Sequence, residues 1–212
     1  VNGSLVFDER YLGKPLVYCG TVGVIPTDVN GRKGWEKKAE VGDIIVMTGG
    51  RIGKDGIHGA TFSSEELHEG SPATAVQIGD PITQRKMYDF IMRARDLGLY
   101  NAITDNGAGG LSSSVGEMAE DTGGCVLDIA KAQERMTLAV PPAKLDEFME
   151  LAARMDVEAT ALGHYTDSGF FDVRYNDRPV ASLPMEFMHD GVPQREREAV
   201  GEAPKVEDIR VD

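Results

Sequence analysis

Residues Gly169–Leu183 read GFFDVRYNDRPVASL, which is two strand-like runs joined by a short turn. The runs are Gly169–Tyr175 and Pro179–Leu183, and Asn176-Asp177 between them is typical of a hairpin turn. A hairpin makes its two strands antiparallel neighbours in the same sheet. This segment therefore favours a mixed sheet over a purely parallel, doubly wound one.

Upstream of the hairpin, predicted strands alternate with predicted helices. The clearest helix begins at Asp80-Pro81, where Asp is the cap and Pro the first helical residue, and it ends near Gly98. Its predicted buried face is Ile82, Met87, Phe90, Ile91 and Ala94. Further helices are expected after a cap at Ser112–Ser114 and from Pro141-Pro142. Strands are expected at Leu16–Ile25, Ile44–Met47, Asn101–Asp105, Cys125–Ile129, Met136–Val140 and Val157–Leu162. The predicted fold class is α/β, a mixed sheet with helices packed on it.

The composition excludes several classes of protein. A formal net charge of -13 argues against a broad nucleic-acid interface, which needs a basic surface. No apolar run approaches the length of a membrane span and no signal peptide is visible, so no membrane partner is expected. Cys19 and Cys125 are the only cysteines and lie in apolar runs, which indicates buried free thiols in a reduced, cytoplasmic compartment.

The organisation along the chain predicts three parts. Residues 1–40 are interpreted as the tail of a preceding domain plus a linker, 41–193 as the main domain, and 194–212 as a charged linker or tail. The chain starts at Val1 with no initiator Met, and its first residues resemble the middle of a domain. We therefore expect it to be a fragment of a longer polypeptide.

A glycine-rich segment, Thr48–Ser64, follows the predicted strand Ile44–Met47. It holds five glycines together with Arg51, Lys54 and His58. Glycines let backbone N–H groups approach an anion, so the segment is suited to binding phosphate or substrate. A long surface loop with glycine turns accounts for it equally well.

A second glycine-rich turn, Thr104–Ser112, places Asp105 at the end of a strand and ahead of a helix. A carboxylate there can hold Mg²⁺, and the helix N-terminus can receive phosphate. Alternatively, Asp105 caps the turn through the backbone, which is the commoner use of Asp in such turns. Gln77 in an apolar segment either bridges backbone groups or recognises a substrate, and Gln133 precedes a strand within a charged sequence.

Several motifs together resemble one family, phosphoribosylformylglycinamidine synthase, over most of residues 1–193. They are Gly49–Ala60 (GGRIGKDGIHGA), Val76–Pro81 (VQIGDP), Asp105–Ser113 (DNGAGGLSS), Gln133–Met136 (QERM) and Thr166–Gly169 (TDSG). The resemblance implies an aminoimidazole ribonucleotide synthetase C-terminal-domain-like fold. Residues 1–25 are similar to the last strands of the ATP-binding domain that precedes it.

The resemblance also implies an ATP-dependent carbon–nitrogen ligase with glutamine as amido donor. Gln77, Gln133, Arg51 and His58 would then contact a ribonucleotide substrate and Asp105 would bind Mg²⁺. No catalytic residue is implied within this chain, and ATP would bind mostly outside it. The implied partners are the ATP-binding domain and a glutaminase, and a dimer through the neighbouring domain is left open.

One departure from the family pattern lies before Gln133, where Ala130-Lys131-Ala132 replaces a longer segment. Two other hypotheses therefore stand beside the ligase. The chain could be a domain of another enzyme of the same superfamily, or a structural or dimerising domain without catalysis. The His58-Gly59-Ala60 motif and the Gln77–Pro81 motif favour the ligase.

Overall fold

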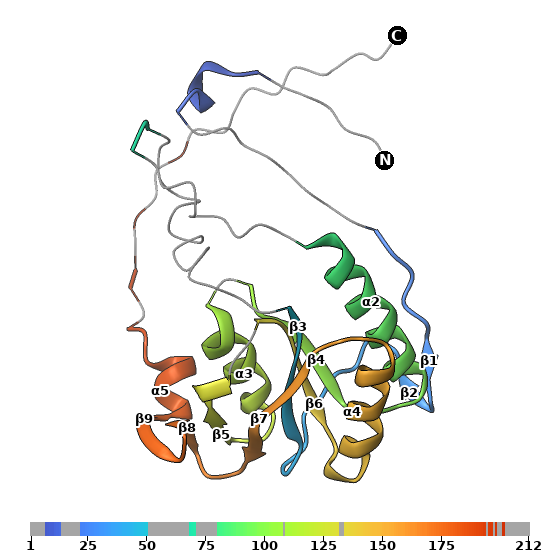
Figure 1. Ribbon diagram of the computed structural model, residues 1–212. Helices are drawn as coiled ribbons and strands as arrows, with labels where there is room; N and C mark the ends of the chain where they lie inside the picture. Colours follow the sequence, from blue (N-terminus) through green and yellow to red (C-terminus); the bar gives the residue numbers. More distant parts are fainter. Residues whose placement is uncertain are drawn as a thin grey trace.

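The computed structural model describes residues 7–13, 22–50, 68–70, 80–107, 109–131, 134–193, 195, 196, 198 and 201. Figure 1 shows a central sheet with helices on both sides, which confirms the predicted α/β class. In chain order the described elements are η1 Glu9–Tyr11, β1 Asp28–Val29, β2 Arg32–Lys33, β3 Ile44–Gly50, α2 Pro81–Asp96, β4 Ala102–Asp105, α3 Gly110–Glu120, β5 Gly124–Asp128, η3 Ile129–Lys131, β6 Glu134–Val140, η4 Pro142–Lys144, α4 Leu145–Arg154, β7 Ala159–Thr166, β8 Phe170–Tyr175, β9 Arg178–Pro184 and α5 Met185–Asp190.

Within the described residues, one seven-stranded sheet has the order β4-β6-β3-β7-β5-β8-β9. Its pairs are antiparallel except for β5 with β8, so the sheet is mixed as predicted. β8 and β9 form the predicted hairpin. Asn176 and Asp177 in its turn have φ of 47° and 65°, the left-handed conformation that a tight two-residue hairpin turn requires at both positions.

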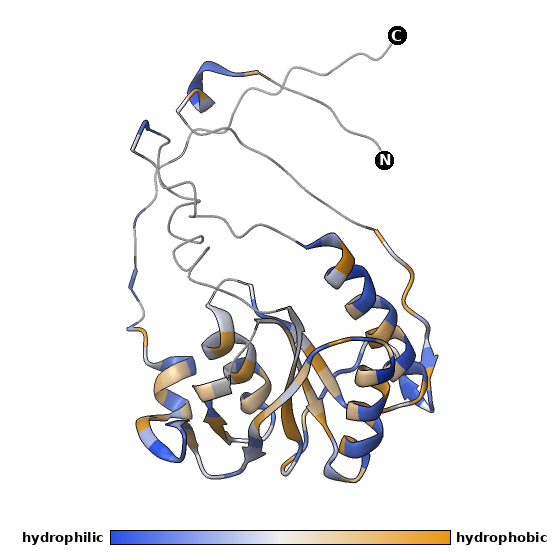
Figure 2. Ribbon diagram, viewed as in Figure 1, coloured by the Kyte–Doolittle hydropathy of each residue, from blue (hydrophilic) through white to orange (hydrophobic). Residues whose placement is uncertain are grey.

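Two hydrophobic cores lie on opposite faces of the sheet. Ile45 and Met47 of β3 point to the core formed with α3 and α5, whereas Val46 points to the core formed with α2 and α4. This alternation follows from the two-residue period of a strand. In the second core the rings of Phe90 and Phe148 meet edge to face with centroids 5.0 Å apart. Figure 2 shows the outer surfaces of α2 and α4 to be largely hydrophilic.

The start of α2 confirms the predicted cap. Asp80 Oδ1 accepts hydrogen bonds from the backbone N–H groups of Ile82 (3.0 Å) and Thr83 (3.1 Å), and Pro81 is the first helical residue. Met87, Phe90 and Ala94 are buried as expected. The prediction for Ile82 is wrong, because its side chain is 68% exposed on the first turn of the helix.

Two other local predictions also need correction. The predicted serine cap of α3 is wrong, since Gly109 is the N-cap and the serines lie inside the helix. Gly109 has φ of 91°, a conformation that glycine adopts without strain. The strand predicted over Leu16–Ile25 does not include residues 22–25, which are exposed and form no strand within the described residues. The rest of that range lies outside the described residues.

The short hairpin of β1 and β2 is held to the end of α2 by hydrogen bonds. Asn30 Nδ2 donates to the carbonyl oxygens of Arg95 (3.0 Å) and Asp96 (3.2 Å) at the end of α2. The boundary expected at residue 41 remains a prediction. In the described part of the chain, no helix is long and apolar enough to cross a membrane.

Candidate functional site

The sheet topology brings several loop starts to one edge, which we call the rim. β3 and β4 each pair antiparallel with β6, so both end where β6 begins. Gly50 at the end of β3 pairs with Glu134 at the start of β6, and Asp105 at the end of β4 pairs with Met136. α2 leads directly into β4 and runs the opposite way, so Asp80 at its start also lies towards the rim (Figure 1).

Asp105 is the predicted site residue that the structure describes, and its side chain is exposed at the rim. Its Oδ1 accepts a hydrogen bond from the backbone N–H of Gly107 at 2.8 Å. Asp105 therefore caps the turn through the backbone, which was one of the two roles expected from the sequence. Within the described residues, Oδ2 has no hydrogen-bond partner. One carboxylate oxygen thus holds the loop while the other is available to a ligand.

The fit of Asp105 to Mg²⁺ can be judged from this geometry. Mg²⁺ is commonly bound in proteins by one or two carboxylates, with waters and substrate phosphates completing the coordination. Oδ2 of Asp105 supplies one such ligand. Among the described residues no group of three or more His, Cys, Asp or Glu side chains could hold a metal by itself. The exposed carboxylate of Asp105 therefore fits a Mg²⁺ whose coordination is completed by waters and substrate phosphates.

The turn after Asp105 rests on a buried polar network. Thr137 Oγ1 donates to Asn106 Oδ1 at 2.6 Å, and Asn106 Nδ2 lies 3.2 Å from Met47 Sδ. The hydroxyls of Ser114 and Thr137 are 3.3 Å apart, which joins α3 to the same network. These side chains are buried, so their hydrogen bonds fix the loop against the sheet. The N-terminus of α3 beside them has no side-chain cap.

Sequence reasoning missed Asn106, Ser114 and Thr137 as supports of the site. Asn106 is part of the motif DNGAGG, but nothing local predicts that its amide meets Thr137, which is 31 residues away. Thr48 is a further such residue. It lies opposite Met136 at the rim, and its buried hydroxyl has no hydrogen-bond partner within the described part of the protein.

The other predicted contacts, Gln77, Gln133, Arg51 and His58, lie outside the described residues. Residues within three positions of Arg51, Gln133 and Gln77 are described, whereas none near His58 is. Gly50 precedes Arg51, Glu134 follows Gln133, and Asp80 lies three positions after Gln77. Because these three neighbours all lie at or towards the rim with Asp105, the topology agrees with a composite site drawn from separate segments.

Comparison with known proteins identifies the class. The family of AIR synthase related proteins, C-terminal domain, matches residues 40–176, and the chain belongs to this family. "Phosphoribosylformylglycinamidine synthase subunit PurL" of Methanopyrus kandleri is 38% identical over 93% of this chain and 30% of its own length. PurL of Staphylococcus aureus (strain JH9) is 36% identical over 90% of this chain and 28% of its own length. The resemblance to the synthase is confirmed.

Solved structures of PurL share the fold. Thermotoga maritima PurL complexed with FGAR superposes with a TM-score of 0.69 at 24% identity, over 82% of this chain and 32% of that protein. The structure of PurLQS from the same organism superposes with a TM-score of 0.63 at 20% identity, over 82% of this chain and 30% of that one.

The match to these relatives is partial in two ways. The chain spans about 30% of the length of the curated relatives it matches. The alignment with the Methanopyrus protein runs over 221 residues although this chain has 212, so the relative has residues with no counterpart here.

Proposed function

We propose that this chain is the substrate-side domain of a phosphoribosylformylglycinamidine synthase. The whole enzyme would convert formylglycinamide ribonucleotide to the amidine with ATP and glutamine, in the cytoplasm. The observation that carries the proposal is the meeting of β3, β4 and β6 at the rim, next to the segments that hold the family-like motifs. The 38% identity to PurL over 93% of the chain supports the substrate class.

Within this proposal, Gln77, Gln133, Arg51 and His58 contact the ribonucleotide, and Asp105 holds Mg²⁺ through Oδ2. The ion, held there by Asp105, would supply positive charge to offset that of phosphoryl oxygens when ATP phosphorylates the formamide oxygen. The turn from Asp105 to Gly109 is kept in place by the Asn106–Thr137 hydrogen bond, so the carboxylate is positioned before ligand arrives.

The ATP site and the glutaminase would lie mostly outside this domain. Structures of Thermotoga PurL complexed with ATP and of PurLQS support an ATP-using enzyme with additional subunits. Domain boundaries at residues 40 and 193 belong to the same proposal, and the family match over residues 40–176 is compatible with them. Buried Cys125 agrees with a reduced compartment.

Asp105→Asn in the full polypeptide tests the proposal. Asn keeps an oxygen for the Gly107 N–H and so preserves the turn, but it loses the charge that holds Mg²⁺. We expect kcat/KM for amidine formation to fall about 100-fold, since about 3 kcal/mol of transition-state stabilisation is lost. The Mg²⁺ concentration for half-maximal activity should rise.

Asp177→Asn is the matched control, because Asp177 is exposed in the β8–β9 turn and Asn also tolerates its φ of 65°. It should leave both quantities unchanged. Normal activity and Mg²⁺ dependence in Asp105→Asn would support a structural domain instead. A thermal-shift panel separates the superfamily rival, because stabilisation by thiamine phosphate or selenophosphate rather than by formylglycinamide ribonucleotide would favour another member.

A further inference from the structure

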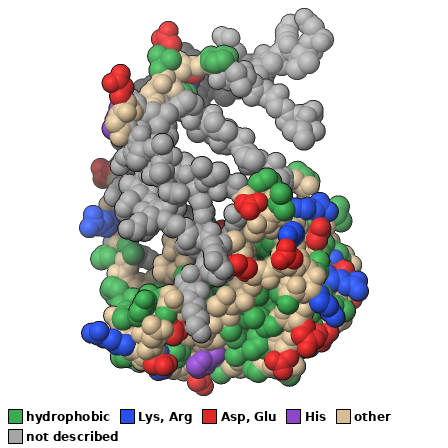
Figure 3. Space-filling model, viewed as in Figure 1, with side chains coloured by type: hydrophobic (Ala, Val, Ile, Leu, Met, Phe, Trp, Pro, Cys, Tyr) green, Lys and Arg blue, Asp and Glu red, His purple; other side chains and the backbone are tan. Residues whose placement is uncertain are grey.

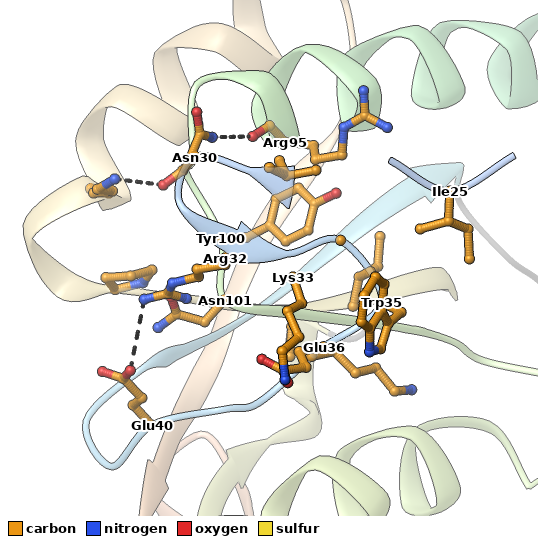
Figure 4. Close-up of a pocket in the computed structure, with 18 residues that line it drawn as sticks. Ile25, Asn30, Arg32, Lys33, Trp35, Glu36, Glu40, Arg95, Tyr100 and Asn101 are labelled. Carbon is orange, nitrogen blue, oxygen red and sulfur yellow. Dashed lines mark hydrogen bonds and ion pairs between the residues drawn. The ribbon is translucent and has the colours of Figure 1, made fainter. Parts of the chain in front are cut away.

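A cavity lies at the end of the sheet opposite the rim, and we call this end the base. β3 and β4 begin at the base and β6 ends there. The cavity has a volume of about 560 Å³ and lies between the β1–β2 hairpin, residues 34–37, the end of α2 and the start of β4 (Figure 4). This volume falls within the range of small-molecule sites.

The walls of the base cavity are held in place by specific hydrogen bonds. Asn30 bonds the hairpin to the carbonyl oxygens at the end of α2. Arg32 Nη1 donates to Asn101 Oδ1 at 2.8 Å, and Asn101 Nδ2 donates in turn to buried Asp43 Oδ2 at 2.9 Å. Lys144 Nζ donates to the carbonyl of Gly98 on the far wall. The cavity is thus built by contacts between separate elements, which favours a preformed site.

The charge of the lining is opposite to that of the chain. Five cationic side chains line the cavity against two carboxylates, whereas the whole chain has a formal net charge of -13. The cations are Arg32, Lys33, Lys37, Arg95 and Lys144, and the carboxylates are Glu36 and Glu40. Three of these cations have carboxylate partners. Lys33 pairs with Glu36 at 2.8 Å and Arg32 with Glu40 at 3.9 Å, and these four side chains are more than half exposed, so both pairs are weak. Arg95 pairs at 2.7 Å with Asp96, which lies outside the lining. Lys37 has no ion-pair or hydrogen-bond partner within the described residues. Figure 3 shows Lys and Arg side chains on the side of the molecule that carries α2.

Two aromatic side chains from different segments border the same space. Trp35 is 58% exposed among the described residues, a large exposed area for an indole. Tyr100 is half-buried, and burial raises the pKa of its hydroxyl to about 12, so it remains a neutral donor at physiological pH. Among the described strands, β4 lies at the edge of the sheet. One side of its backbone therefore has no neighbouring strand there, and the start of β4 lines the cavity.

We propose that the base cavity binds a nucleotide, with its ring against Trp35 and Tyr100 and its phosphate held by Lys33 and Lys37. A flat ring gains from contact with aromatic faces, and a phosphate gains from charge-assisted hydrogen bonds with lysines. The site does not share residues with the rim and does not depend on the function proposed for it.

The single tryptophan makes the proposal directly measurable. Trp35 is the only Trp in the chain, so its fluorescence reports on this cavity alone. AMP titrated into the 212-residue protein without divalent metal should quench Trp35 with a saturable curve. Adenosine should bind about 10-fold more weakly, since it lacks the phosphate. Inorganic phosphate alone should cause no quenching.

Lys33→Gln/Lys37→Gln should weaken AMP binding at least about 10-fold, while Gln keeps most of the side-chain volume. Lys38→Gln is the matched control, because Lys38 is a neighbouring exposed lysine that does not line the cavity. Unfolding midpoints of both variants should equal that of the unmodified protein.

Several results would overturn the nucleotide site. They are a linear, non-saturating response, equal dissociation constants for AMP and adenosine, or equal dissociation constants for the lysine double variant and Lys38→Gln. Asp105→Asn should leave the AMP titration unchanged. Loss of enzyme activity in Asp105→Asn and loss of AMP binding in the lysine variant are thus separate outcomes, and either proposal can fail alone.

Discussion

The rim and the base each contain a buried polar network next to an aspartate, but the two networks differ in charge. At the rim, Asn106, Thr137 and Ser114 are neutral, and the carboxylate of Asp105 is exposed beside them. At the base, the aspartate itself is buried. Asp43 is 3% exposed, and its Oδ2 accepts from the backbone N–H of Glu40 (3.0 Å) and from Asn101 Nδ2 (2.9 Å).

This difference distinguishes a structural carboxylate from a candidate ligand. A buried carboxylate is costly unless hydrogen bonds compensate for lost water, and at the base Asn101 also connects Asp43 to the guanidinium of Arg32. Asp105 has one such bond and an oxygen that faces solvent. The number of donors on each carboxylate, together with its burial, therefore separates Asp43, which stabilises the fold, from Asp105, which we propose as a Mg²⁺ ligand.

The largest expected effect in this comparison is that of Asp43→Ala. The change removes the buried acceptor of the Glu40 N–H and of the Asn101 amide, which are part-buried donors, so the free energy of unfolding should fall by about 3 kcal/mol. Urea unfolding followed by circular dichroism measures it. Glu40→Ala removes an exposed carboxylate 3.9 Å from the same Arg32 and should cost less than about 0.5 kcal/mol. Equal costs for the two variants would mean that Asp43 does not anchor the base.

The neutral network at the rim should contribute less. Thr137→Val keeps the shape of the side chain but leaves Asn106 Oδ1 without its donor, so the free energy of unfolding should fall by about 1.5 kcal/mol. Thr104→Val is the matched control. Thr104 pairs directly with Thr137 across β4 and β6, and its hydroxyl has no hydrogen bond within the described residues. A cost for Thr104→Val as large as that for Thr137→Val would assign the effect to strand packing instead.

Features set by neighbouring residues could be predicted from the sequence. Asp80 and Pro81 predict the start of α2 because a cap and a fixed φ act within one turn. Asn176 and Asp177 predict the β8–β9 turn for the same local reason. Asp105 was identifiable as a candidate because a carboxylate at a strand end before glycines is a local pattern.

Features set by distant contacts could not be predicted. The order of the strands places β3 between β6 and β7, which come about 90 or more residues later in the chain. The Asn106–Thr137 bond exists only because β4 and β6 are neighbours in that order. The apolar residues 22–25 suit a strand by composition, but no partner strand pairs with them within the described residues, and a strand needs one.

Among the described residues, the groups whose pKa is strongly raised lie at the base; they are Tyr100, Cys125 and Tyr165. Tyr165 pairs with Cys125 next to Asp43, and its buried hydroxyl has no hydrogen-bond partner in the described part of the chain. Burial, followed by the negative charges of Cys125 and Asp43, raises the pKa of Tyr165 above its ordinary value of 10.0. Burial raises the pKa of Cys125 from 9.0 to about 12.

Tyr165→Phe tests this through a gain in stability. The folded protein keeps the protons of the Tyr165 hydroxyl and the Cys125 thiol at a pH where the unfolded chain releases them. The free energy of unfolding should therefore decrease as pH rises above about 9. Phe removes the unpaired hydroxyl and one of these protons. At pH 7 it should increase the free energy of unfolding by about 1 kcal/mol, and above pH 10 the loss with pH should be shallower. Tyr175→Phe, at an exposed site, should change neither quantity. If Tyr165→Phe is destabilised at pH 7, the hydroxyl of Tyr165 has a hydrogen-bond partner such as a buried water, in addition to the direct contacts of the protein.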